Sequence, residues 1–330
     1  MEMNLKPQKA DTTIFEGEGG GYYAWTAAKT PVVVEAAIGA GRLVLQPQGF
    51  ALPHYADANK IGYVIQGSCT VGLILPEKPE EKVLIIEKGD AILCPIGSVT
   101  WWFNGGDSDV NIIFLGETSQ SYTPGLFDYF FLTGALGVLR GFSTEFIAKA
   151  YHLNHEQSKH LVESQANALV VKIDAGVVNG FPHKCNCTKE EYVVNLDTDT
   201  ESETDHTERV GLTPKLVRLE VEAVLDPYYS TTHQIMYVTK GGGRIQIVGL
   251  NGTRVLDEVV EEGHLIVVPK FFLVALMASD KGLECLCVST SPRPLTMKIG
   301  GNTSAYKALS SSVLEVALNV SPEFIKNIKS

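Results

Sequence analysis

The sequence predicts a mainly β protein made of two tandem β-barrels, each followed by a helical arm. Short runs rich in Val, Ile and Leu, broken by Gly, Pro and Asn, are typical of the strands of a sandwich or barrel. The segment 53–67 matches the segment 227–241, at an offset of 227 − 53 = 174 residues. With 330 residues, of which 45% are hydrophobic, the chain is long enough for two ordinary domains.

The internal repeat extends well beyond that first segment. Without a gap, the same offset aligns Pro53 with Pro227, Tyr55 with Tyr229, Tyr63 with Tyr237, Val64 with Val238, Gly67 with Gly241, Val71 with Ile245, Leu73 with Ile247, Gly89 with Gly263 and Pro95 with Pro269. We therefore expect two units that share one order of strands.

Strands and helices are expected in the same order in both units. The strand runs are RLVLQP, IGYVIQGSCTVGLIL, KVLIIEKGDAILCPI and NIIFLG in the first unit, and LVRLEV, QIMYVTKGGGRIQIVG, HLIVVP and CLCVST in the second. The segment 143–163 has apolar residues at helical spacing after the N-cap candidates Ser143 and Thr144, and 310–328 repeats this pattern. We expect domains at 1–165 and 166–330, with a solvated acidic loop at about 197–208.

Charge and composition exclude several classes of partner. The sequence has 27 basic and 38 acidic residues, a net charge of 27 − 38 = −11, and a pI of about 5.2. Such a surface repels phosphate, so neither nucleic acid nor an anionic membrane is expected as a partner. The N-terminal segment lacks the apolar stretch of a secretory signal, and the six cysteines are widely spread, so a cytoplasmic protein with reduced thiols is expected.

The motif that begins at Gly89 resembles the cupin family. Five residues follow Gly89, then Pro-Ile-Gly at 95–97 and Asn104, which fits the cupin pattern Gly-x5-Pro-x-Gly-x2-His-x3-Asn except at the His. Among two-cupin proteins, the segments 52–67, 89–108, 141–154, 241–272 and 301–323 are similar to the legumin-type seed storage globulins, which include the glutelins. This resemblance implies jelly-roll barrels, and homotrimers or hexamers that assemble through the helical arms.

The chain also departs from the storage members of that family. These relatives enter the secretory pathway, are vacuolar, and are cut at an Asn-Gly bond, whereas Val210 precedes Gly211 at the comparable place here. The resemblance therefore implies a single-chain cytosolic relative of the glutelin type.

Metal-binding cupins such as the germins hold Mn or Fe with three His and one Glu. The residues that align with these four ligands are Pro53, Tyr55, Lys60 and Thr100 in the first unit, and Pro227, Tyr229, Gln234 and Val274 in the second. Since none of the eight is Cys, His, Asp or Glu, no metal and no cofactor is expected in either barrel.

His54 lies between two of these positions. Strand alternation is expected to turn it to the opposite side of the strand, as a rim or packing residue. A shift of one residue in the alignment would still supply only a single His.

Four further features have alternative interpretations. His183, Cys185 and Cys187 alternate and could bind zinc, although a loop with free thiols is favoured. Cys285 and Cys287 are expected in the core of a strand. The glycine-rich segment 17–23 is interpreted as a flexible lead-in. The aromatic clusters at 101–103 and 127–131 could line a pocket or an oligomer contact, with core packing favoured.

The favoured function is that of a non-enzymatic bicupin of the seed storage type, a nutrient reservoir. The alternative is a cytosolic cupin that binds a small molecule, of unknown identity, or catalyses a metal-independent reaction. The residues proposed to line such a ligand pocket are His54, Tyr55, Lys60, Thr100, Tyr229 and Gln234.

Overall fold

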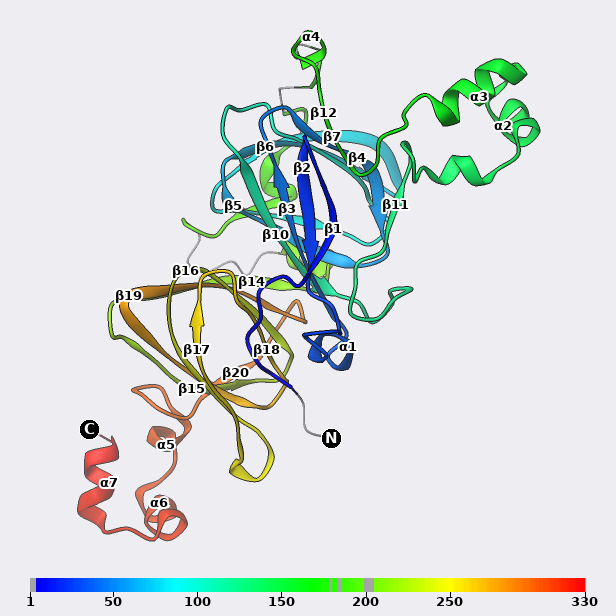
Figure 1. The fold of residues 1–330 in the computed structure, drawn as a ribbon. Coiled ribbons are helices and arrows are strands. Elements are labelled where there is room, and N and C mark those ends of the chain that lie inside the picture. Colours follow the sequence, from blue (N-terminus) through cyan, green and yellow to red (C-terminus); the bar gives the residue numbers. More distant parts are fainter. Residues whose placement is uncertain (1–3, 179, 183–184, 199–204, 330) are drawn as a thin grey trace. The chain divides into compact units, whose positions relative to one another are not determined.

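The computed structural model describes residues 4–178, 180–182, 185–198 and 205–329. The described chain forms two compact units (Figure 1). The N-terminal unit is Lys9–Pro214, and the C-terminal unit combines residues up to Gln8 with those from Lys215 onward. The two-barrel architecture with helices after each barrel is confirmed.

The N-terminal unit packs two antiparallel sheets face to face. The first sheet contains, in spatial order, β1 (Thr12–Gly17), β2 (Gly20–Ala24), β3 (Ile38–Leu45), β10 (Val110–Glu117), β5 (Asn59–Gln66), β8 (Asp90–Cys94) and β13 (Val193–Asn195). The second contains β11 (Tyr129–Phe131), β4 (Gly49–Ala56), β9 (Val99–Phe103), β6 (Ser68–Leu75) and β7 (Lys78–Glu87), with β12 (Val170–Lys172) also paired to β4. The helices are α1 (Val32–Glu35), α2 (Thr144–Tyr151), α3 (His155–Glu163) and α4 (Ala175–Val178).

The C-terminal unit is built on two long strands, β16 (Gln234–Val248) and β19 (Leu273–Ser289), which pair with each other along most of their length. The other elements are β14 (Thr213–Leu219), β15 (Val224–Ser230), β17 (Arg254–Glu261), β18 (Leu265–Val268), β20 (Thr296–Lys298), α5 (Ala305–Ala308), α6 (Ser311–Leu318) and α7 (Pro322–Lys329). Short 3₁₀ turns lie at Val138–Gly141, Lys189–Glu191 and Asp205–Arg209 in the N-terminal unit, and at Leu250–Gly252 in the C-terminal unit.

The expected repeat is visible strand by strand. At the offset of 174 residues, β4 corresponds to β15, β5 and β6 to the two halves of β16, β8 to β18, and β9 and β10 to the two halves of β19. Gly67 and its counterpart Gly241 have positive φ angles of 83° and 72°. Because side chains disfavour this conformation, both turns need glycine at the same place.

The helical arms repeat as well. Ser143 caps α2, where its side chain accepts a hydrogen bond of 3.2 Å from the backbone N–H of Phe146. The C-cap residues of α2 and α6 are His152 and Asn319, both in the left-handed conformation and separated by 319 − 152 = 167 residues. Each arm is therefore a pair of short helices with the same turn between them.

The glycine-rich segment 17–23 is not a flexible lead-in. It carries the turn between β1 and β2, and β2 pairs with β3 inside the first sheet. The prediction was wrong because glycine content signals local freedom, whereas Gly20 and Gly21 are buried against the neighbouring strand β3 and side chain of Tyr23.

The unit boundary also differs from the expected 165/166. Residues 166–214 belong to the N-terminal unit because β12 adds to β4 and β13 adds to β8. Part of the acidic segment, 199–204, lies outside the described residues. Helical sequence at 143–163 suggested an end to the first domain, but two short strands after it return to the same barrel.

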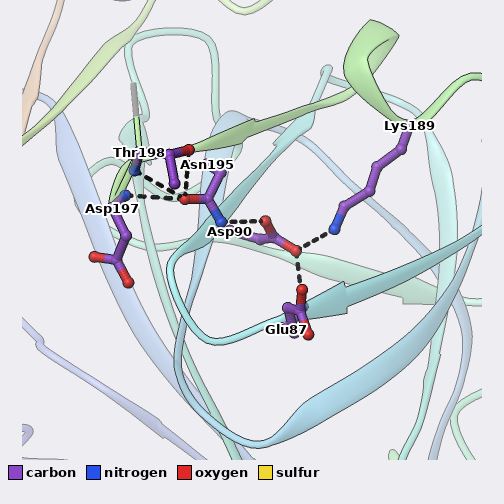
Figure 2. Close-up of polar contacts among 6 residues, drawn as sticks. All are labelled: Glu87, Asp90, Lys189, Asn195, Asp197 and Thr198. Atoms are coloured by element: carbon purple, nitrogen blue, oxygen red, sulfur yellow. Dashed lines mark hydrogen bonds and ion pairs between the residues drawn. The ribbon is translucent and has the colours of Figure 1, made fainter. Parts of the chain in front are cut away.

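Buried Asp90 fastens this returning segment to the barrel (Figure 2). Its carboxylate accepts hydrogen bonds from the backbone N–H of Glu87 at 2.8 Å and from the Asn195 amide at 3.0 Å. The Lys189 ammonium lies 2.6 Å away in an ion pair. A buried carboxylate with three donors is well compensated, so it can hold both β13, through Asn195, and the 3₁₀ turn before it, through Lys189.

We expect Asp90→Ala to destabilise the N-terminal unit. The change leaves the Lys189 ammonium and the Asn195 amide without their acceptor, which should lower the free energy of unfolding by about 2–3 kcal/mol. Urea denaturation of the full chain measures the loss. The exposed Asp107→Ala is the control, with a change under about 0.5 kcal/mol. Equal midpoints for the two variants would contradict the assigned role of Asp90.

Candidate functional site

A cavity of about 280 Å³ lies inside the N-terminal barrel. Its walls are mostly apolar and aromatic. Ile14 and Leu136, which belong to the lining, are 48% and 62% exposed, so the cavity reaches the surface beside them. The remaining lining residues are Tyr22, Ala24, Ala40, Leu43, Ala51, His54, Lys60, Trp102, Phe114, Leu126, Phe127, Asp128, Tyr129, Phe131, Leu169 and Val170.

Strand β4 faces the cavity with His54, contrary to the expectation. His54 is 7% exposed and belongs to the lining, while Tyr55 is half-buried on the other side of the strand, where its ring stacks on Phe130 at 4.9 Å. The alignment of Pro53 and Tyr55 with inward positions was therefore wrong by one residue. The inward pair is His54 and Ala56, which are both buried.

A directional chain of hydrogen bonds holds His54 in place. Its Nδ1 donates to the backbone carbonyl of Leu52 at 2.7 Å, which leaves Nε2 as an acceptor. The Thr100 hydroxyl donates to Nε2 over 3.4 Å, and the indole N–H of Trp102 donates to the same hydroxyl at 3.2 Å. Each polar group in this series of hydrogen bonds thus has a partner within the protein.

Lys60 places a buried cation in the cavity wall. Its side chain lies on β5, and the residue is 3% exposed. The Nζ atom lies over three rings, at 4.2 Å from the centroid of Tyr129, 5.1 Å from Phe114 and 5.7 Å from Phe127. We call Phe114, Phe127 and Tyr129 the aromatic cage. Cation–π attraction compensates part of the cost of removing the ammonium from water.

Burial and the neighbouring charge set the protonation of these two groups. Desolvation lowers the pKa of Lys60 to about 8, against the opposing effects of Cys94 and Asp57. Desolvation, with the charge of Lys60 as the second cause, lowers the pKa of His54 to about 3. At neutral pH the cavity therefore contains a neutral imidazole and a predominantly protonated lysine.

Sequence reasoning gave Tyr22 no role in a pocket, and for the aromatic cluster 127–131, which contains Tyr129, it favoured core packing over a pocket. The hydroxyls of Tyr22 and Tyr129 share a hydrogen bond of 2.6 Å across the cavity, and burial raises the pKa of both. Tyr129 also contacts His54 edge to face at 5.1 Å. The aromatic run 127–131 was the available signal, since it supplies three aromatic lining residues and Asp128 from β11 and the loop before it.

The family model described as "Cupin" matches residues 4–159 and 198–326. The chain belongs to the cupin family. Its two barrels correspond to the two matched ranges, so it is a bicupin. Over the described residues, this cupin has no helix of the length and apolarity needed to cross a membrane.

The cupin is distantly related to 11S globulin and glutelin seed storage proteins. It is 24% identical to Cocosin 1 of Cocos nucifera, over 87% of this chain and 78% of the relative. Glutelin type-A 2 of Oryza sativa subsp. japonica is 22% identical over 87% of this chain and 77% of the relative. The solved 11S globulin from Wrightia tinctoria superposes with a TM-score of 0.86, 22% identity, and coverage of 98% and 92%. The predicted family and fold are confirmed.

The N-terminal barrel of this cupin does not fit a metal ion of the family type. With the corrected alignment, the four ligand positions hold His54, Ala56, Lys60 and Thr100. One imidazole is the only ordinary ligand among them, and the Lys60 ammonium repels a cation. Nowhere among the described residues do three His, Cys, Asp or Glu side chains converge on a common point.

The C-terminal barrel shows the same one-residue shift. Tyr228, the counterpart of His54, is 9% exposed, whereas Tyr229 is half-buried on the other side of β15. Gln234 is buried, and the Oε1 atom of its amide has no hydrogen-bond partner within the described chain. Burial raises the pKa of Tyr228, which Gln234 opposes by a hydrogen bond. These two barrels thus differ at the positions that face inward.

The structure describes all the cysteines singled out in the sequence, but not the histidine that accompanies two of them. His183 lies outside the described residues. Cys185 is exposed, and the half-buried Cys187 directs its thiol toward the carbonyl of Val83 at 3.9 Å. Cys285 and Cys287 are 2% and 4% exposed within β19, which confirms their place in the core.

We expect Lys60→Met to stabilise the protein near pH 7. The folded state lowers the pKa of Lys60 from 10.5 to about 8, which corresponds to a cost of about 3 kcal/mol at neutral pH. This cost disappears as the pH rises through 8 toward 10.5, because the folded protein releases that proton first. The stability difference between variant and wild type should therefore shrink over this range.

Urea denaturation at several pH values between 7 and 10.5 measures this difference. Lys159→Met, at an exposed position of α3, is the control and should show no comparable gain. A loss of stability in Lys60→Met at pH 7, or a gain that is independent of pH, would show that the lysine is not a buried, uncompensated cation.

Proposed function

We propose that this cupin is a non-enzymatic protein of the seed storage globulin type that serves as a nutrient reservoir. Its similarity to Cocosin 1 and glutelin type-A 2 over most of the chain supports this. The structural observation that carries it is the hydrogen-bond chain of Trp102, Thr100 and His54. These groups occupy the place of a catalytic metal centre, yet their polar atoms are engaged with one another.

A reservoir protein should accumulate and then be consumed. We expect this cupin to be abundant in the mature seed, scarce in leaf, and degraded during germination. Targeted mass spectrometry of the three tissues, normalised to total protein, measures this. A constant low level in all three would contradict storage and favour a housekeeping role.

We also propose that the protein self-associates as a homotrimer, or as a hexamer of two trimers, through its helical arms. Apolar side chains lie exposed on both arms: Phe146 is 61% exposed on α2, Val316 is 84% exposed on α6, and Phe324 is 50% exposed on α7. Isolated short helices gain most of their stability from burying such a face. A second copy of this chain provides a matching apolar arm.

We expect a mass near three times 35.8 kDa, or a multiple of it, from light scattering coupled to gel filtration. The double variant Phe146→Asp, Val316→Asp places charges on both arms and should shift the protein toward the monomer. Lys159→Asp puts the same residue on the polar side of the N-terminal arm and should leave the mass unchanged. A monomeric wild type would contradict assembly through the arms.

The cavity supports a second candidate function, which is the binding of a small molecule, with or without metal-independent catalysis. It is lined by aromatic side chains and one cation, as ligand sites commonly are. The solved 11S globulin from Wrightia tinctoria is described as revealing an auxin binding site, so a protein of this fold binds a small ligand. The two candidate functions are compatible, since a reservoir can carry a ligand.

A further inference from the structure

The Lys60 ammonium has no counter-ion among the residues that the structure describes. Within the described residues, its Nζ makes neither a hydrogen bond nor an ion pair, although the residue is only 3% exposed. Two acidic groups raise its pKa against the effect of burial, the Cys94 thiol and, to a smaller extent, the Asp57 carboxylate. That carboxylate is already engaged, because it accepts the backbone N–H of Tyr122 at 2.7 Å and of Asp128 at 3.0 Å. A buried ammonium held only by ring faces is costly and would gain from an anion.

Lys60 stands at a position that a metal ligand occupies in the metal-binding cupins, and it places a positive charge there. In the metal-binding cupins, acidic and imidazole ligands surround a bound metal cation. In this chain the cation is the Lys60 side chain, which faces the same interior space. His54 beside it is neutral and Thr100 donates its proton to His54, so neither side chain neutralises the ammonium. Asp128 is an acidic residue of the same lining, but within the described residues it makes no ion pair with Lys60. A direct counter-ion for this fixed positive charge therefore has to come from a negative group on a ligand.

The other lining residues of the cavity indicate the shape, size and polarity of the uncharged part of that ligand. The aromatic cage and Trp102 present ring faces and edges, which suit a flat apolar group. At about 280 Å³, the cavity falls just below the range of about 300–1,000 Å³ typical for drug-sized molecules, so a single ring fits better than a large one. Asp128 also lines the wall, and its Oδ2 has no hydrogen-bond partner within the described chain.

We propose that the N-terminal barrel binds a small aromatic carboxylate, with Lys60 as its counter-ion and the aromatic cage around its ring. The Oδ2 atom of Asp128 accepts a hydrogen bond where the ring carries a hydroxyl or N–H group. This proposal rests on the second candidate function above and specifies its ligand class. A charge-assisted contact in a largely apolar cavity gives both orientation and selectivity for the anion.

Isothermal titration calorimetry on the full chain tests this with two probes of the same shape, phenylacetate and the uncharged phenylacetamide. We expect wild type to bind phenylacetate at least about 10-fold more tightly than phenylacetamide. Lys60→Met keeps an unbranched side chain, one atom shorter than that of Lys, without its charge. It should weaken phenylacetate binding by about 10-fold or more and leave phenylacetamide within about 2-fold of wild type.

Lys159→Met serves as the control for a lost surface lysine and should bind both probes like wild type. Equal affinity of wild type for the two probes would overturn the role of Lys60 and leave the cavity as an apolar site, so the second candidate function would survive. Unchanged phenylacetate affinity in Lys60→Met would likewise overturn the role of Lys60 and leave the cavity as an apolar site. If neither probe binds at ligand concentrations up to about 10 mM, both the proposal and the second candidate function fail for this ligand class.

Discussion

The two-residue period of strand β4 decides the chemistry of the N-terminal barrel. Because successive side chains face opposite sides of a sheet, either His54 or its neighbours Pro53 and Tyr55 point inward, and never both. The structure turns His54 inward, with a hydrogen bond to Leu52 on one nitrogen and to Thr100 on the other. Once this alternation is set, Lys60 on the adjacent sheet and Tyr129 on the paired strand complete the cavity wall.

The residues that line the cavity are not those that would make the folded state most stable. A core optimised only for packing would place an apolar side chain at position 60, since a desolvated ammonium destabilises the folded state. The aromatic cage reduces that cost by cation–π contacts at 4.2–5.7 Å without removing it. A buried charge with such a cost is typical of a binding site, and it is the reason to consider a ligand in a bicupin that resembles the seed storage globulins.

The segment between the barrels is structural as well as connecting. Strands β12 and β13 add to two different sheets of the N-terminal unit, and Asp90 joins Lys189 and Asn195 to the barrel. The N-terminal unit therefore reaches to Pro214, and the helical arm lies within its sequence range and not at its end. Both arms carry exposed apolar side chains.

The sequence by itself determined the two-unit plan, the strand order and the arms. These follow from local signals: apolar runs, a gapless 174-residue repeat, and glycines such as Gly67 and Gly241 whose turns require positive φ. It also placed His54, Lys60 and Thr100 in one region of the barrel. Only the tertiary structure decided that His54 faces inward and Tyr55 outward, and that Tyr22 meets Tyr129 from 107 residues away. Strand register and pairing across sheets depend on the packing of the whole barrel, and no local pattern encodes them.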